Sequence, residues 1–377
     1  MGKIYEFGSG RPDPGSIPIQ GLVEAAARAI PRIGGDFALY PGDKGYQGLR
    51  EVAAARFKHR ESIELPVESI TLTNGSMQGI TLVAEAFAEP GDVVITEEFT
   101  YSGTLGVFRN RGLRIVGVPL DEHGMRMDAL EEALKEWTDR GQKPKFIYPL
   151  VTYQNPTGSV MPLSRRKELL ALAREYDVLV IDDNCYGDVR FEGEPPPALY
   201  TLDDVDSVVY LASLSKILSP AIRLGYLIAP EPLMSRALGK RWDGGISTLS
   251  ASIVAEYFRE NLWSHVEEIN AIVKKKRDTL FGALEEHLGG SASWSHPVGG
   301  LFLWLKLPED TDLGKLSQLA QEKGVLYASG RSFHCYNEEV PHLRLAFGYP
   351  SLDEIKEGIA LLATCIQQAQ AAPVAAG

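Results

Sequence analysis

The 377-residue chain has few cysteines and lacks long apolar runs. Its three cysteines, Cys185, Cys335 and Cys365, form no CxxC pair, and their odd number argues against a disulfide framework. No stretch of about 18 apolar residues is present, so no membrane span is predicted. Residues 1–16 contain no apolar run that could serve as a signal peptide. These absences predict a cytoplasmic protein in a reducing compartment, with no membrane partner.

Positive charge and metal-ligand motifs are also scarce. The chain has 38 Lys and Arg against 50 Asp and Glu, and its formal net charge of -12 argues against non-specific binding to nucleic acid. A few arginines in a cleft could still bind an anionic ligand, because they set the field locally. The seven histidines show no HExxH or HxxxH spacing, so we expect no metal site.

Short apolar runs alternate with helical patterns from residue 69 to residue 229. The runs are SITLTNG, VVITEEF, RIVGVPL, FIYPL, VLVIDD, VVYLAS and GYLIAP, and helical segments such as MDALEEALKEW and SRRKELLALAREY lie between several of them. Strand–helix alternation predicts an α/β fold with a mainly parallel sheet covered by helices on both faces.

The pattern changes after residue 229 to long helical periodicity, followed by the runs FLWLKL, GVLYASG and HLRLAFG and a last helix. A chain of this length is expected to form more than one domain. We therefore predict an N-terminal segment at 1–45, a large domain at 46–262 and a smaller α+β domain at 263–377. The run KKKR at 274–277 is expected to be a solvated face of the long helix.

A lysine stands directly after the predicted strand VVYLAS, in the segment SLSKILSPAIRLGY. Lys216 is flanked by Ser213 and Ser215 and is well placed to form a Schiff base, because desolvation and nearby cations lower the pKa of a lysine amine. Arg223 could supply both that positive field and a fork for a phosphate. Alone, the segment would be read as a polar loop with a solvated lysine, but three neighbouring motifs favour the functional interpretation.

These motifs also follow predicted strands, where ligands bind in parallel sheets. Asp183 ends the strand VLVIDD, and a carboxylate there can keep a pyridine nitrogen protonated; Tyr186 follows as a phenol donor. The segment QNPTG at 154–158 forms a turn, and residues 75–77 open a helix whose free N–H groups suit a phosphate. Taken alone, the turn at 154–158 is explained about as well by turn chemistry as by function. For Asp183 and for residues 75–77, a capped turn and an ordinary helix start would each be the favoured explanation.

The motifs occur in the order TNGS, Tyr101, NPTG, DNCY, SLSKILSPAIRLG and RLAF. This order resembles the fold-type-I pyridoxal-phosphate (PLP) aminotransferases of class I/II over nearly the whole chain. Within that family, QNPTG and HLRLAF are similar to the group of 2-aminoadipate, kynurenine and aromatic or branched-chain aminotransferases. The resemblance implies a seven-stranded sheet in a PLP-binding large domain, and a segment 1–45 that packs with the small domain near the substrate. It also implies a homodimer that acts on an amino acid and a 2-oxo acid.

The resemblance implies catalytic roles for Lys216, which would carry PLP as a Schiff base, for Asp183, which would pair with the pyridine nitrogen, and for Tyr101, which would stack on the ring. Asn155 and Tyr186 would bond the phenolic oxygen. The phosphate would be surrounded by Gly75, Ser76, Met77, Ser213, Ser215 and Arg223.

Three further residues follow from the same resemblance. Tyr40 would reach the phosphate of a neighbouring subunit, and Arg344 would bind the substrate α-carboxylate, with Gly10 and Asn155 close by. The chain departs from relatives at Cys185, where Asn-Cys-Tyr replaces the frequent Asp-Pro-Tyr, and at Met77, where Gln or Ala is common. These departures leave the donor open between aromatic, branched-chain and 2-aminoadipate-like amino acids, with 2-oxoglutarate or pyruvate as acceptor.

Other functions remain open at this point. A PLP-dependent lyase, such as a carbon–sulfur β-lyase, or a decarboxylase would use the same residues. A ligand-sensing module like the effector domain of MocR-type regulators would need an attached helix-turn-helix domain. Because the resemblance begins within the first residues, we expect no such domain here.

Overall fold

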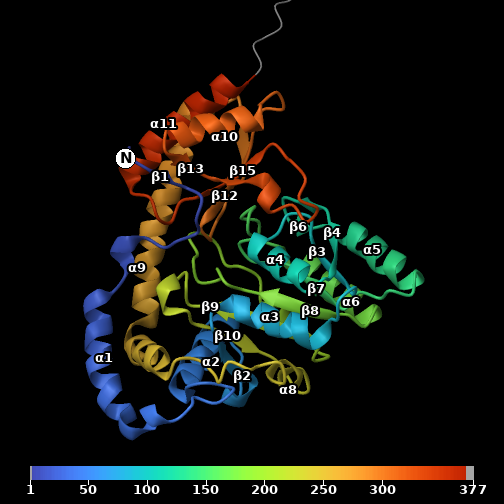
Figure 1. Ribbon diagram of the computed structural model, residues 1–377, viewed down its shortest axis with the longest axis vertical. Helices are drawn as coiled ribbons and strands as arrows, with labels where there is room; N and C mark the ends of the chain where they lie inside the picture. The colour runs from blue at the N-terminus through green and yellow to red at the C-terminus, as the bar shows by residue number, and fades with distance from the viewer. Residues whose placement is uncertain (1, 371–377) are drawn as a thin grey trace, which may run out of the picture.

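The computed structural model describes residues 2–370, with a seven-stranded sheet at its centre (Figure 1). The strand order is β2-β10-β9-β8-β7-β3-β4, and β10 alone is antiparallel to its neighbours. These seven strands are β2 (Ile70–Thr73), β3 (Val93–Glu97), β4 (Arg114–Val118), β7 (Phe146–Tyr148), β8 (Leu179–Asp183), β9 (Val208–Ser213) and β10 (Gly225–Ile228).

Alternate residues of these strands enter two different cores, because successive side chains in a strand point to opposite faces. Val208 packs with one face and Val209 with the other. Helices α5, α6 and α7 cover the first face and α3, α4 and α8 the second. Their bounds are α3 (Ser76–Phe87), α4 (Ser102–Asn110), α5 (Met127–Asp139), α6 (Leu163–Glu175), α7 (Leu199–Leu202) and α8 (Leu233–Leu238). The predicted α/β fold with a mainly parallel, helix-covered sheet is confirmed.

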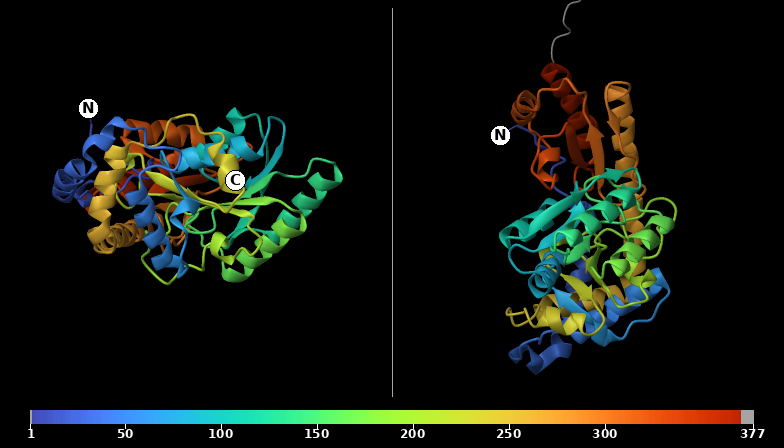
Figure 2. Two further views of the ribbon diagram at one scale, coloured as in Figure 1. Left: turned by 90° about the horizontal axis from the view of Figure 1, so that it is seen from below. Right: turned by 90° about the vertical axis from the view of Figure 1, so that its right-hand side faces the viewer.

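A 41-residue helix, α9 (Thr248–Leu288), runs from the large sheet to a small antiparallel sheet of order β11-β12-β15-β14 (Figures 1 and 2). It packs against α1 (Ile19–Ile33), α2 (Gln47–Glu61) and α11 (Leu352–Ala369). The remaining elements are β5 (Leu120–Asp121), β6 (Gly124–Met125), β11 (Ser293–Trp294), β12 (Phe302–Lys306), α10 (Leu313–Glu322), β14 (Ala328–Ser329) and β15 (His342–Ala346).

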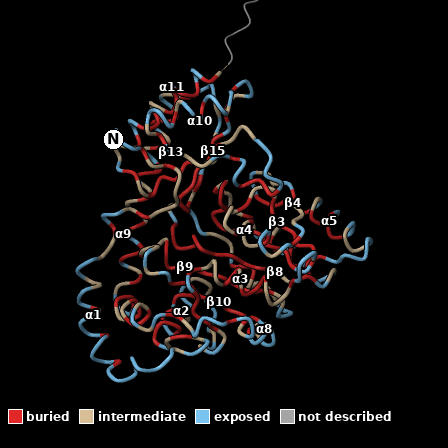
Figure 3. The backbone as a smooth tube through the Cα atoms, viewed as in Figure 1, coloured by how far each residue is buried: buried red, intermediate tan, exposed pale blue. Residues whose placement is uncertain are grey.

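The N-terminal segment joins the small sheet region through β1 (Tyr5–Glu6), which pairs in parallel with β13 (Val325–Leu326). Helix α1 then runs along α9 and exposes most of its outer face, whereas the central strands are buried (Figure 3). No helix among residues 2–370 is both long and apolar enough to cross a membrane.

The basic run in α9 is not a solvated face, so that prediction was wrong for half of the run. Lys276 and Arg277 are each 4% exposed. Lys276 pairs with Asp13 and donates to the carbonyl of Gly348 at 2.8 Å, while Arg277 donates to the carbonyl of Pro297 at 3.0 Å. Their partners lie in the N-terminal segment and the small domain, which helical periodicity cannot reveal.

Candidate active site

A cavity of about 240 Å³ lies at the carboxyl ends of the parallel strands, where the loops after β2, β3, β7, β8 and β9 meet. The residues that line it include most of the predicted set, drawn from five separate segments of the chain. They are Gly75, Ser76, Met77, Tyr101, Tyr148, Leu150, Asn155, Asp183, Cys185, Tyr186, Ser213, Ser215, Lys216, Pro220 and Arg223.

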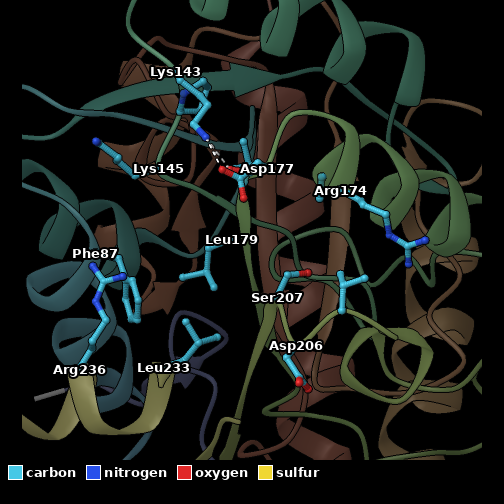
Figure 4. Close-up of a pocket in the computed structure, with 14 residues that line it drawn as sticks. Phe87, Lys143, Lys145, Arg174, Asp177, Leu179, Asp206, Ser207, Leu233 and Arg236 are labelled. Carbon is cyan, nitrogen blue, oxygen red and sulfur yellow. Dashed lines mark hydrogen bonds and ion pairs between the residues drawn. The ribbon is translucent and has the colours of Figure 1, made fainter. Parts of the chain in front are cut away.

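A larger pocket, of about 540 Å³, lies at the opposite edge of the sheet (Figure 4). Its cations are already engaged, since Lys143 lies 2.7 Å from Asp177 and Arg236 stacks 4.2 Å over the ring of Phe87. It also lies at the amino ends of the strands, away from the predicted motifs. The smaller cavity is therefore the candidate active site.

Lys216 extends from the loop after β9 into the cavity, where protein atoms surround most of its side chain. Its Nζ donates to the backbone carbonyl of Gly10 at 2.8 Å and lies 5.6 Å from the ring centre of Tyr186. Burial, reinforced by Arg344 and Arg223, lowers the pKa of the Lys216 amine to about 8. An appreciable fraction of this amine is therefore neutral, and nucleophilic, near neutral pH.

Asp183 ends β8 and is the only carboxylate among the described residues that line the cavity. Its two oxygens accept hydrogen bonds from the Tyr148 hydroxyl at 2.6 Å and from the Cys185 thiol at 2.8 Å. Burial raises the pKa of the carboxyl group, and these two bonds oppose the rise. A buried acid without a cationic partner is suited to a cationic ring nitrogen.

The loop after β2 forms a cradle for an anion. Gly75 has φ +71° and immediately precedes α3, whose start has no side-chain cap. A Cβ on Gly75 would lie 2.7 Å from Nη2 of Arg223, so only glycine lets the guanidinium approach this backbone. With Ser213 and Ser215 on the adjoining loop, the cradle combines free N–H groups, hydroxyls and one cation, a donor set that fits a phosphate.

Arg344, on β15, is a buried cation without a carboxylate within ion-pair distance among the described residues. Its Nη1 donates to Oδ1 of Asn155 at 3.1 Å and its Nη2 to the carbonyl of Gly8 at 2.6 Å, while Nε finds no acceptor in the described part of the chain. The ring centres of Phe302 and Phe333 lie 4.2 and 4.7 Å from the guanidinium carbon of Arg344. Burial lowers its pKa to about 10, as expected for a charge that no carboxylate compensates.

Three predicted residues, Arg344, Gly10 and Tyr40, are not among those that line the cavity. Arg344 lies next to it, through its hydrogen bond to Asn155. The Gly10 carbonyl contacts Lys216, and a Cβ on Gly10 would lie 2.5 Å from the Phe302 ring, so the N-terminal segment passes very close to the site. Tyr40 is 90% exposed and stands outside the cavity. In one chain, therefore, Tyr40 does not contribute to the cavity.

Sequence reasoning missed Tyr148, Leu150 and Pro220, which also line the cavity. Tyr148 was read only as part of the apolar strand FIYPL. Its position at the end of that strand, next to the strand of Asp183, was the signal that could have identified it.

The sequence model of the family described as aminotransferase class I and II matches residues 3–362. The chain belongs to this family. It is an aminotransferase, and the family uses PLP. The predicted family is thus confirmed.

Three similar proteins illustrate the match. Aromatic-amino-acid aminotransferase 1 of Thermococcus litoralis is 34% identical over 369 residues, 97% of this chain and 88% of the relative. The 2-aminoadipate transaminase of Thermus thermophilus is 32% identical over 370 residues, 97% and 90% of the two chains. A structure of Pyrococcus horikoshii kynurenine aminotransferase in complex with PMP has a TM-score of 0.92 at 33% identity and covers 99% of this chain and 93% of that one. The aminotransferase fold therefore extends over both sheets.

Proposed function

We propose that this aminotransferase binds PLP in the 240 Å³ cavity through Lys216 and transfers amino groups from an aromatic, branched-chain or 2-aminoadipate-like L-amino acid to 2-oxoglutarate or pyruvate. The observation that carries the proposal is that one cavity joins a partly neutral lysine, a buried acid and an anion cradle.

When bound, PLP supplies an aldehyde for attachment and a ring that withdraws electrons while its nitrogen is protonated. Asp183 would hold the proton on that nitrogen, because it is the one acid in the cavity lining. Tyr101 would stack on the ring, Asn155 and Tyr186 would donate to its phenolic oxygen, and the anion cradle around Gly75 would hold the phosphate.

Lys216 would also move the proton. The Lys216 amine, with a pKa of about 8, could accept the proton from the substrate Cα and later give a proton back. The two Nη groups of the Arg344 guanidinium would bind the substrate carboxylate and fix its orientation. That orientation would decide which bond at Cα breaks. The Gly10 carbonyl, within 2.8 Å of Nζ, would help to hold the amine in place.

The donor class is proposed from the surroundings of Arg344. Phe302 and Phe333 flank the guanidinium, and Trp304 lies 5.8 Å from Phe333, so apolar and aromatic surface borders the carboxylate site. The similar enzymes are named for aromatic, 2-aminoadipate and kynurenine substrates. Both observations support a donor with a long apolar or aromatic side chain.

We further propose a homodimer in which Tyr40 reaches the cradle of the second subunit. Tyr40 and Trp242 are 90% and 91% exposed, and Ile19, Val23 and Leu39 are also exposed on or near α1. Exposed apolar groups of this kind favour burial against a second copy. Analytical sedimentation should show a dimer. Tyr40→Phe should weaken PLP binding but leave the dimer associated.

The decisive experiment is reconstitution followed by half-reactions. Wild-type protein with PLP should develop near-visible absorbance, and borohydride should fix the cofactor to the peptide that contains Lys216. A donor alone should then give one equivalent of 2-oxo acid per site, and an acceptor should restore the starting spectrum. Lys216→Ala is the matched control. Continuous release of ammonia or carbon dioxide from donor alone would refute transamination, and absence of a borohydride adduct would refute the role of Lys216.

A further inference from the structure

Asp183, the carboxylate that lines the cavity, accepts hydrogen bonds from two uncharged side chains, those of Tyr148 and Cys185. We propose that Tyr148 and Cys185 are positioning residues that orient the Asp183 carboxylate and keep it ionised for a cationic ring nitrogen, without neutralising its charge. This inference rests on the proposed function, because it concerns the group that Asp183 would face.

Tyr148 makes the stronger of the two contacts. Its hydroxyl lies 2.6 Å from Oδ2 of Asp183, and it accepts a hydrogen bond from Oγ1 of Thr104 at 3.0 Å. Because Thr104, on α4, occupies a lone pair of the phenol oxygen, the Tyr148 proton is left for Asp183. Tyr148 is fully buried at the end of β7, so packing fixes the direction from which it donates.

Cys185 holds the other oxygen. Its Sγ lies 2.8 Å from Oδ1 of Asp183 and lines the same cavity. A thiol is a weaker donor than a phenol, so the two contacts are unequal. The residue that departs from the frequent Asp-Pro-Tyr pattern is therefore a donor to Asp183, a role that proline could not take.

Both donors keep their protons. Burial, with the negative charge of Asp183, raises the pKa of the Tyr148 hydroxyl and of the Cys185 thiol well above their ordinary values. No Lys, Arg or His among the described residues forms an ion pair with Asp183. A cationic partner would stabilise the carboxylate equally well, but it would cancel the field that a pyridinium needs.

The test measures the PLP dissociation constant of the cofactor-free protein as a function of pH, for Tyr148→Phe, Cys185→Ala and Cys185→Ser. Loss of the phenol bond to a charged acceptor should weaken binding about ten- to hundredfold. Loss of the thiol bond should weaken it about two- to tenfold. Cys185→Ser, which retains a donor, should restore most of the affinity.

The shape of the pH profile separates tuning of Asp183 from a general loss of structure. Removing a donor raises the pKa of Asp183. PLP affinity falls at low pH as Asp183 becomes protonated, and this fall (the acid limb of the profile) should occur at higher pH in Tyr148→Phe. A merely structural defect would lower affinity equally at all pH values. Tyr153→Phe and Cys365→Ala are matched controls, since Tyr153 is a buried phenol whose hydroxyl has no partner among the described residues and Cys365 is a buried thiol in α11.

The outcomes are distinguishable. If wild-type apoprotein fails to bind PLP, the proposed function falls. If wild-type binds PLP but Tyr148→Phe shows the same affinity and the same acid limb, only this inference is overturned. An affinity loss in Cys185→Ser as large as that in Cys185→Ala would remove Cys185 from the proposal.

Discussion

Arg344→Lys provides the sharpest test of the carboxylate site. The substitution keeps the positive charge but replaces a planar fork with a single ammonium, so one of two charge-assisted hydrogen bonds to a substrate carboxylate is lost. Such a bond contributes about 1.5–3 kcal/mol, which corresponds to a loss of about ten- to hundredfold in kcat/KM. No carboxylate of the described chain competes for this guanidinium, so the full effect should be visible.

The donor and the acceptor should be affected alike, since both carry an α-carboxylate. Steady-state kinetics with the amino acid varied and then with the 2-oxo acid varied would measure both losses. Arg109→Lys is the control, because Arg109 is an exposed arginine outside the cavity that donates to the carbonyl of Cys335 at 2.9 Å. Unchanged kcat/KM for either substrate in a folded Arg344→Lys protein would refute the assignment.

Further expectations concern the lysine, the acid and a buried ion pair. Lys216→Ala should abolish turnover while the fold, followed by circular dichroism, stays intact; substantial transamination by this variant would remove Lys216 from its role. Asp183→Ala should lower kcat by several orders of magnitude, since the ring nitrogen would lose its proton, and a near-normal rate in single-turnover assays would contradict that. The rate of PLP capture by apoprotein should rise with pH through about 8, because only the neutral amine of Lys216 attacks, and a stopped-flow profile that is flat across this range would tell against the lowered pKa. Arg56→Met, which leaves the buried carboxylate of Asp188 without its closest partner, should lower the free energy of unfolding by about 3 kcal/mol in urea titrations. Arg126→Met, which removes an exposed ion pair, should leave the free energy of unfolding nearly unchanged.

Much of the site could be predicted because its residues lie where strands end. Lys216, Asp183 and Asn155 are far apart in sequence, but parallel strands bring their carboxyl ends to one edge. Tyr148 escaped notice because a tyrosine that closes an apolar strand has the pattern of a core residue. Its hydroxyl can reach Asp183 only because β7 pairs with β8 in the sheet.

Contacts between distant segments could not be predicted. Lys276 looked solvated within KKKR, yet its partner Asp13 lies 263 positions earlier in the chain. Helix α9 crosses residue 262, the predicted boundary between the large and small domains, and a helix can pass between two sheets without any change in its own periodicity. Local patterns predict elements, whereas these pairings depend on how the elements are packed.

The N-terminal segment explains how an acidic chain can present a strongly cationic cavity. Among residues 2–370, neither Lys216 nor Arg344 forms an ion pair with a carboxylate. Both instead donate to backbone carbonyls, of Gly10 at 2.8 Å and of Gly8 at 2.6 Å. A carbonyl dipole satisfies a donor but carries no net charge, so the positive field of the two side chains is retained. A buried cation that is solvated in this way, and not paired, remains available to an anionic ligand. The local arrangement of a few donors, and not the net charge of -12, therefore determines which ligand charge the cavity accepts.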